Sequence, residues 1–315
     1  MSGGRLGIDV GGTASRWVLC DAAGQVLARG AAAGATGHVF NPAERQRLQA
    51  ALDHIAADIA AVAPSPDTIV AGITGFGSIV EAEIAQLLAA TFGVKRGGLT
   101  VIDDISLAYA AVFAPGEGHL VSAGTGSIGL HLDSERGYVR VGGRGILVDD
   151  AGSGTWIALR ALDEIFRSLD RHGGFREVQA LADAIFAITG GGEWHIVRQF
   201  VYGGDRGRIG TLATGVAQAA QAGDRMALQI IDEAGRELAA LAKALMARTE
   251  PKPVRFIGGV LKLHPGVGAA IVAELRGHDV AIIETDAALA AARLPEDAGW
   301  LATFATLSGR PGPQQ

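Results

Sequence analysis

The chain has 315 residues, of which 49% are hydrophobic and 19% charged, and its formal net charge is −6. At roughly 150 residues per domain this length predicts two domains, and the apolar content excludes an intrinsically disordered chain. The negative net charge and the lack of a basic block argue against broad electrostatic binding of nucleic acid.

The glycine and cysteine content narrows the class of protein further. The 46 glycines lie in clusters between apolar runs, without the three-residue period of collagen. The single cysteine, Cys20, excludes an internal disulfide and a cysteine-ligated metal site within one chain, and it predicts a reducing, cytoplasmic location. No apolar run reaches the ~18 residues of a membrane span, and Met1 leads into a strand pattern without a signal-peptide core. We therefore expect neither a transmembrane helix nor a signal peptide.

The first predicted elements are strands around a glycine turn. Apolar residues alternate with small or polar ones over 6–10, Gly11-Gly12 forms a turn, and strands follow over 16–20 and 25–30. The pattern then predicts, in order, a helix over 42–62, a strand over 68–74, a helix over 79–91, a strand over 99–102 and a helix over 104–114. A domain boundary is expected near Pro115–Gly118.

The strand–turn–strand pattern then occurs a second time. Strands are predicted over 119–123 and 128–132 around Gly124-Thr125-Gly126, and a further strand over 138–141. Helices dominate 152–248, and the remaining expected elements are a strand over 254–257, a helix near 267–276, a strand over 279–283 and C-terminal helices. The repeated glycine-tipped hairpin and the mixed order of strands and helices predict two related α/β domains.

The first turn has the chemistry of a phosphate site. Its backbone N–H groups and the Thr13 hydroxyl can bind phosphate oxygens. Asp9 repels phosphate but can hold Mg²⁺, usually through water. The alternative interpretation is a plain hairpin with a capping aspartate.

The second turn, Gly124-Thr125-Gly126, matches the G-x-G-x-x-G pattern of dinucleotide folds when Gly129 is included. A Rossmann loop must open a helix, whereas 128–132 alternates like a strand. We therefore expect a second phosphate-binding hairpin and not a dinucleotide site.

Two acidic pairs stand where helices begin. Asp103-Asp104 lies between a predicted strand and a helix, and Asp149-Asp150 precedes another helix. Aspartate is a common helix N-cap, so each pair is consistent with capping as well as with catalysis or ligand binding. Gly258-Gly259 follows a buried strand and would either line an adenine site or form a turn.

Three other enzyme classes lack their motifs here. None of the lysines stands in a G-K-[ST] run, which excludes a P-loop. The histidines show no paired spacing typical of catalytic zinc, and no G-x-S-x-G sequence marks an α/β-hydrolase.

The order of these motifs resembles that of the actin-like ATPase superfamily, which includes sugar kinases, Hsp70 and actin. Within it, residues 121–161, with Gly-Thr-Gly-Ser, Gly-Gly, Asp-Asp-Ala-Gly-Ser-Gly and Trp156, resemble the BadF/BadG/BcrA/BcrD-type group that contains N-acetylglucosamine kinase and bacterial glucosamine kinase. The resemblance covers about residues 5–300, and its motifs are specific in combination.

The resemblance implies an α/β, two-domain actin-like ATPase (ribonuclease H-like) fold with a central interdomain cleft. The N-terminal domain would comprise residues 1–117 joined by a C-terminal helix over 286–315, and the C-terminal domain residues 118–285.

The resemblance also assigns site residues by matching motif positions. ATP and Mg²⁺ are the implied cofactors, with Asp9 holding Mg²⁺ through water and Asp104, rather than Asp103, acting as the catalytic base. The implied nucleotide-binding residues are Gly11, Gly12 and Thr13, then Gly124, Thr125 and Gly126, and for adenosine Gly258 and Gly259. The implied sugar contacts are Asn41, Thr74, Gly75 and Asp150.

The implied activity is phosphorylation of the 6-hydroxyl of N-acetylglucosamine, a small-molecule amino sugar, by Mg-ATP. Many members have Glu where this chain has Ala151, so glucosamine is an open alternative substrate. A non-catalytic sugar sensor and an ATPase activator are more distant alternatives, although Cys20 alone cannot hold the activator's iron–sulfur cluster. Monomer and homodimer both remain open.

Overall fold

The computed structural model of the chain describes residues 4–62, 65–133 and 137–294. The chain divides into two compact units, which are described separately. Unit 1 takes the described residues among 1–116, 132–139 and 285–315, and unit 2 takes those among 117–131 and 140–284. Both are α/β, as the sequence predicts, and none of the described helices is long and apolar enough to cross a membrane.

In unit 1 the described strands form one mixed sheet in the order β3-β2-β1-β4-β5. The central strand β1 pairs antiparallel with β2 and parallel with β4, and β4 pairs parallel with β5. The strands are β1 (Gly4–Val10), β2 (Ala14–Cys20), β3 (Val26–Ala33), β4 (Pro66–Ile73) and β5 (Leu99–Asp103). The carboxyl ends of the three parallel strands therefore lie at one edge of the sheet, which is where ligands bind in sheets of this kind.

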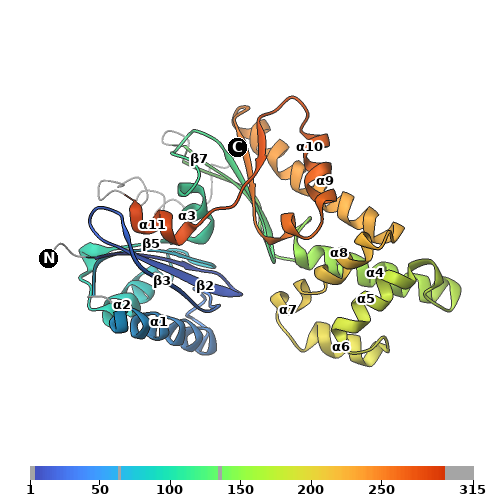
Figure 1. Cartoon of the computed structure of the whole chain (residues 1–315), viewed down its shortest axis with the longest axis horizontal. Helices are drawn as coiled ribbons and strands as arrows, with labels where there is room; N and C mark the ends of the chain where they lie inside the picture. Colours follow the sequence, from blue (N-terminus) through green and yellow to red (C-terminus); the bar gives the residue numbers. More distant parts are fainter. Residues whose placement is uncertain (1–3, 63–64, 134–136, 295–315) are drawn as a thin grey trace. The chain divides into compact units, whose positions relative to one another are not determined.

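Helices cover both faces of this sheet (Figure 1). The alternation of β1 sends Leu6, Ile8 and Val10 into a core shared with α1 (Pro42–Val62) and α2 (Glu81–Phe92). The other face meets α3 (Asp104–Ala110) and α11 (Ala287–Arg293). Gly7 lies directly beneath α11, because a Cβ on it would stand 2.0 Å from the Ala288 carbonyl oxygen.

In unit 2 the sheet order is β10-β9-β6-β7-β8, and its central strand repeats the pairing of β1. Strand β6 pairs antiparallel with β7 and parallel with β9, and β9 pairs parallel with β10. The strands are β6 (His119–Ala123), β7 (Ser127–Asp133), β8 (Gly137–Gly142), β9 (Val254–Ile257) and β10 (Val280–Ile282). The repeated glycine-tipped hairpin predicted from the sequence is thus present in both units.

A helical layer packs on the unit 2 sheet and extends beyond it (Figure 1). Its α-helices are α4 (Gly154–His172), α5 (Gln179–Thr189), α6 (Trp194–Tyr202), α7 (Arg206–Gly210), α8 (Ala213–Gln221), α9 (Arg225–Arg248) and α10 (Pro265–Glu274). Leu238 and Ala242 of α9 share one core with Val121 of β6 and Ile157 of α4. This core fixes the amino end of α4 beside the tip of the β6–β7 hairpin.

The predicted boundaries differ from the structure in a few places. The helix expected over 104–114 ends at Ala110, because the next residues form turns onto Tyr109. The strand expected over 25–30 runs on to Ala33. The C-terminal helix expected over 286–315 is described only as α11, and residues 295–315 lie outside the described residues.

Candidate functional site

The β1–β2 turn of unit 1 presents backbone donors to solvent. The Gly11 N–H donates to the Ala14 carbonyl at 3.1 Å and closes the turn. Gly12 and Thr13 are exposed, and their N–H groups have no hydrogen-bond acceptor among the described residues. A Cβ on Gly34 would stand 2.4 Å from the Gly12 oxygen, so this backbone supports the turn from behind. The turn can therefore offer two adjacent donors to an anion.

Asp9, two residues before this turn, shares its environment with Asp104. Burial, followed by the negative charge of Asp104, raises the pKa of Asp9 to about 6, and Arg16 opposes the shift. Two neighbouring carboxylates at one sheet edge repel each other unless a cation lies between them or close by. Their oxygens are the ligands that Mg²⁺ prefers. Since the described residues contain no cluster of three or more His, Cys, Asp or Glu that could hold a metal, water and phosphate would have to complete the coordination.

The structure separates the two members of the first acidic pair. Asp103 ends β5 and caps α3: its two oxygens accept hydrogen bonds from the Ser106 N–H at 2.8 Å and the Ser106 hydroxyl at 2.9 Å. Burial raises its pKa to about 6. Asp104 begins α3 and accepts a hydrogen bond on Oδ2 from the Thr74 hydroxyl, while Oδ1 accepts from the Ile105 N–H at 3.0 Å. Asp103 thus caps α3, whereas the side chain of Asp104 is bound to the loop that carries Thr74.

Three other predicted site residues lie on loops of unit 1. Thr74 follows β4, and its N–H donates to the Val10 carbonyl at 2.9 Å. Gly75 has φ of +77°, and a Cβ there would meet the His38 ring at 2.6 Å, so the position requires glycine. Asn41 precedes α1 and accepts a hydrogen bond from the Ala43 N–H at 3.0 Å on Oδ1. That cap leaves the Asn41 amide nitrogen without a partner in the described chain.

The β6–β7 turn of unit 2 is held by the first turn of α4. The Gly154 N–H donates to the Gly124 carbonyl at 2.9 Å, and the Thr155 hydroxyl donates to the Thr125 carbonyl at 2.8 Å. The carbonyl oxygens are therefore directed toward α4. The N–H groups of Thr125 and Gly126 have no acceptor in the part of the chain that the structure describes.

Asp150 lies against this turn with an unusual backbone. Its φ of +68° is the only positive value among the described residues other than glycine. The side chain is 3% exposed, and its Oδ2 is buried without a hydrogen-bond partner among the described atoms. A Cβ on Gly126 would stand 2.9 Å from that oxygen. Burial raises the pKa of Asp150, and the Ser127 N–H and the charge of Arg206 oppose the rise. A buried acceptor of this kind favours a hydrogen-bond donor from a ligand.

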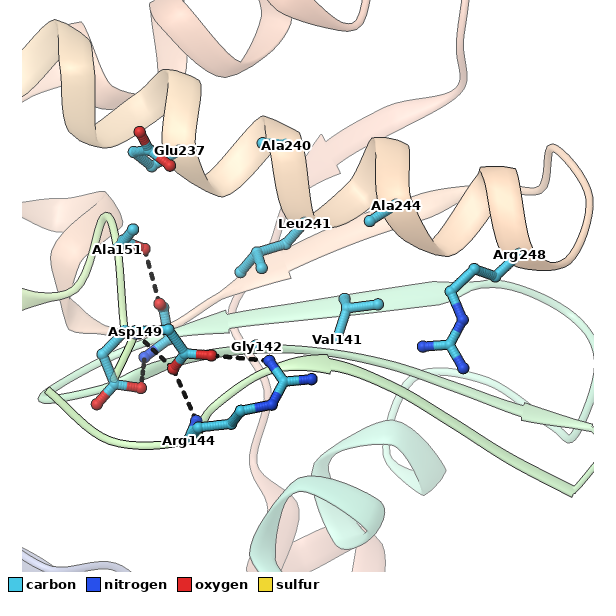
Figure 2. A pocket seen from close by; sticks show the side chains of 12 residues that line it. Val141, Gly142, Arg144, Asp149, Ala151, Glu237, Ala240, Leu241, Ala244 and Arg248 are labelled. Carbon is cyan, nitrogen blue, oxygen red and sulfur yellow. Dashed lines mark hydrogen bonds and ion pairs between the residues drawn. The ribbon is translucent and has the colours of Figure 1, made fainter. Parts of the chain in front are cut away.

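Asp149 holds Asp150 and the preceding loop in place (Figure 2). Its Oδ1 accepts hydrogen bonds from the Arg144 N–H at 2.7 Å and the Asp150 N–H at 2.6 Å, and its Oδ2 pairs with Arg144 Nη1 at 3.0 Å. Partial burial disfavours ionisation, but these bonds together hold the pKa of Asp149 below its usual value. The N-cap of α4 is Ser153, which accepts from the Trp156 N–H at 3.1 Å. Capping by the second acidic pair is therefore ruled out.

The same loop borders a pocket of about 330 Å³ on the α9 side of unit 2 (Figure 2). Leu241 and Glu237 of α9 line it opposite Arg144 and Asp150. The sequence analysis did not find this pocket, because its two walls are about 90 residues apart in the chain.

The two predicted adenosine glycines have different surroundings. Gly258 has φ of +114°, and a Cβ on it would stand 2.3 Å from the Ala123 carbonyl, so it brings the end of β9 directly against the end of β6. Gly259 has open space around its Cα. Gly129 lies inside β7, so the strand that excludes a Rossmann loop is confirmed.

Comparison with known proteins gives a family and a fold. The model of the BadF/BadG/BcrA/BcrD ATPase family matches residues 6–291. The chain is 30% identical over 152 residues to the N-acetylmuramic acid/N-acetylglucosamine kinase of Clostridium acetobutylicum; the match covers 48% of this chain and about half, 49%, of that relative.

Two solved structures are similar over nearly their whole length. A protein proposed to be an N-acetylglucosamine kinase, from Chromobacterium violaceum, has a TM-score of 0.71 at 23% identity, covering 92% of this chain and 98% of that one. A ROK family glucokinase from Streptomyces griseus, in complex with glucose and AMPPNP, has a TM-score of 0.60 at 17% identity, covering 92% and 98%. These likenesses establish the actin-like ATPase fold that the sequence predicts.

Proposed function

The chain belongs to the BadF/BadG/BcrA/BcrD ATPase family, and from that membership we propose that it is an ATP-dependent amino-sugar kinase. The favoured reaction transfers the γ-phosphoryl group of ATP to the 6-hydroxyl of N-acetylglucosamine. The protein would act in the cytoplasm, where ATP is abundant and a lone thiol stays reduced.

The observation that carries the proposal is that Asp103 and Asp104, although adjacent, bind different parts of the fold. A capping aspartate alone would explain one carboxylate at the start of α3. Asp103 supplies that cap with both oxygens, yet Asp104 is held by the hydroxyl of Thr74, whose N–H donates to Val10 at the end of β1. A side chain oriented in this way is suited to accept the proton of an attacking hydroxyl, a role worth ~10²–10⁴ in rate.

The remaining unit 1 residues fit the phosphate and sugar ends of this reaction. The N–H groups of Gly12 and Thr13 would bind phosphate oxygens, and Asp9 would hold Mg²⁺ through water. Mg²⁺, when bound, neutralises charge on the transferring phosphate. Asn41, Thr74 and the Gly75 backbone would contact the sugar and determine which hydroxyl faces Asp104.

In unit 2 the Gly124–Gly126 turn would bind phosphate oxygens of a nucleotide. The free N–H groups of Thr125 and Gly126 are neutral donors that cannot reorganise, which is the property that stabilises charge in phosphoryl transfer. Gly258 and Gly259 would border the adenosine. Asp150 would accept a hydrogen bond from a sugar hydroxyl on its unpartnered Oδ2.

Glucosamine is the second candidate substrate. Ala151 replaces an acidic residue found in many members, and its carbonyl, rather than its side chain, makes a contact: it accepts the Ser127 hydroxyl at 2.7 Å. Ala151 lines the same pocket as Arg144. A carboxylated sugar such as N-acetylmuramic acid, which the clostridial relative is named for, also belongs in the test.

The deciding experiment is a coupled assay of ADP release with each of glucosamine, N-acetylglucosamine, N-acetylmuramic acid, glucose and N-acetylmannosamine. We expect N-acetylglucosamine to give the highest kcat/KM and the product to be the 6-phosphate by phosphorus NMR. Sugar-independent ATP hydrolysis would favour an ATPase activator. ATP or sugar binding without turnover would favour a sugar sensor, and in either case the kinase proposal would be withdrawn.

A further inference from the structure

Helix α7 brings an arginine to the back of the unit 2 phosphate turn. The Thr155 hydroxyl lies 2.8 Å from the Thr125 carbonyl and 3.2 Å from the Arg206 carbonyl, so one side chain joins the turn to the first residue of α7. At the other end of α7, a Cβ on Gly210 would be 3.5 Å from the same hydroxyl. The backbone of α7 therefore packs directly on the support of the turn.

The side chain of Arg206 is exposed and has no ion pair or hydrogen bond with any described residue. Its neighbour Arg208, on the same short helix, stacks on Phe200 with its guanidinium carbon 4.4 Å from the ring centroid. The three lysines of unit 2 are all occupied by carboxylates; the pairs are Lys243–Glu274, Lys252–Glu250 and Lys262–Glu284. Arg206 is thus a cation available to a ligand in this region.

The charge of Arg206 reaches the site. It is among the influences that oppose the burial-driven rise in the pKa of Asp150, whose carboxylate lies against Gly126. The turn itself offers only neutral N–H donors, and its sequence contains no lysine or arginine. Besides Mg²⁺, a positive side chain from elsewhere in the fold would strengthen the binding of a triphosphate there.

We infer that Arg206 binds phosphate oxygens of the nucleotide held at Gly124–Gly126 and is a catalytic residue of unit 2. This inference rests on the proposed kinase function for its role in turnover. Its binding component, a contact with the phosphates of a nucleoside triphosphate, is measurable without any sugar. Arginine suits this role because its planar guanidinium can donate two parallel hydrogen bonds to one phosphate.

The test compares Arg206→Ala and Arg206→Lys with Arg198→Ala, which removes an exposed arginine from α6 of the same unit. Binding of ATP, ADP and adenosine is measured by titration calorimetry, and thermal unfolding checks the fold of each variant. We expect Arg206→Ala to weaken ATP binding by ~10–100-fold, the range for a charge-assisted hydrogen bond. Arg206→Lys should recover part of this loss. Adenosine binding and the Arg198→Ala variant should match the wild type.

Two results would overturn the inference: unchanged ATP affinity in Arg206→Ala, or an equal loss for adenosine, which would indicate a structural effect. A loss of sugar affinity with normal ATP affinity would also overturn the inference, because it would mean that Arg206 acts on Asp150 and not on the phosphates. If the wild type binds ATP but phosphorylates no sugar, the kinase proposal fails while a selective loss of ATP binding still supports Arg206. If the wild type binds no ATP, both the kinase proposal and the inference about Arg206 fail.

Discussion

The hydroxyl of Thr74 donates a hydrogen bond to Oδ2 of Asp104, and this bond links the loop after β4 to the first residue of α3. Together with the Ile105 N–H, which donates to Oδ1 at 3.0 Å, the threonine sets the orientation of the Asp104 carboxylate. The family resemblance implies that Thr74 contacts the sugar. In the structure its hydroxyl also binds Asp104.

Replacing Thr74 by valine keeps the side-chain shape but removes this donor. We expect kcat to fall by roughly 5-fold with little change in the KM for ATP, since one hydrogen bond is worth about 1 kcal/mol. Thr74→Ser should retain most of the activity. Steady-state kinetics of both variants, with a pH profile of kcat, are the measurement, and equal rates for the valine and wild-type enzymes would show that the bond does not position the base.

Asp104→Asn and Asp103→Asn form a matched pair on adjacent residues. Asp104→Asn should lower kcat by ~10²–10⁴ and leave ATP binding intact, because only proton acceptance is lost. Asp103→Asn should change kcat only a few-fold and leave unit 1 at least as stable at pH 7, because asparagine caps a helix as well as aspartate and the variant removes a buried charge whose pKa is raised to about 6. Reversal of these two effects would assign catalysis to Asp103.

Asp9→Asn should lower the activity and raise the stability of the folded protein at pH 7. Folding raises the pKa of Asp9 to about 6, so the folded state binds its proton more tightly than the unfolded state. Stability therefore falls as pH rises from about 4 to 6, and the ionised carboxylate is destabilising at pH 7. At pH 7 the variant should be more stable than the wild type, by up to about 3 kcal/mol, and should unfold at a higher temperature; at pH 4 the two should unfold at nearly the same temperature.

The same variant should lose activity that added Mg²⁺ does not fully restore. The pKa of Asp103 is also raised to about 6. In the stability measurement, comparing the unfolding temperatures of variant and wild type at the same pH cancels its contribution. Unchanged activity at saturating Mg²⁺ would remove the metal assignment, and a variant less stable at pH 7 would contradict the electrostatic argument.

Asp149→Ala tests the positioning of Asp150. The substitution removes all three hydrogen bonds that hold the Arg144 and Asp150 backbones and the Arg144 side chain. We expect the KM for the sugar to rise ~10-fold while ATP affinity stays within ~2-fold. Arg144→Ala removes one of the three bonds and should have a smaller effect. A drop in unfolding temperature with no change in KM would show that Asp149 stabilises the loop without affecting substrate binding.

Gly258→Ala and Gly259→Ala distinguish structure from ligand contact in the predicted adenosine motif. At Gly258 the new methyl would collide with the Ala123 carbonyl at a strained φ, so thermal unfolding should show clear destabilisation. At Gly259 the methyl meets open space and the fold should be unchanged. If Gly259 borders adenosine, its alanine variant should bind ATP and adenosine more weakly in titrations. Normal affinity for both would exclude that contact.

Much of the local structure was predictable because the features that determine it are local. The two-residue alternation of 6–10 and the Gly11-Gly12 turn specify a hairpin, and the same logic holds for 119–132. The decision against a Rossmann loop followed from the alternation around Gly129 alone. Helix ends were less accurate, as at Ala110, since helices end where turns and packing interrupt them.

The sequence by itself determined that two glycine-tipped hairpins, two acidic pairs and a Gly-Gly strand end exist, and their order indicated the family. Only the tertiary structure decided that Asp103 caps α3 and that Ser153, rather than either member of the second acidic pair, caps α4. Adjacent residues at a helix start point in directions set by the helix phase, so Asp103 meets Ser106 while Asp104 meets Thr74. Only the fold brought the Thr125 and Arg206 carbonyls to the same Thr155 hydroxyl, because these residues are far apart in the sequence and no local pattern encodes the arrangement.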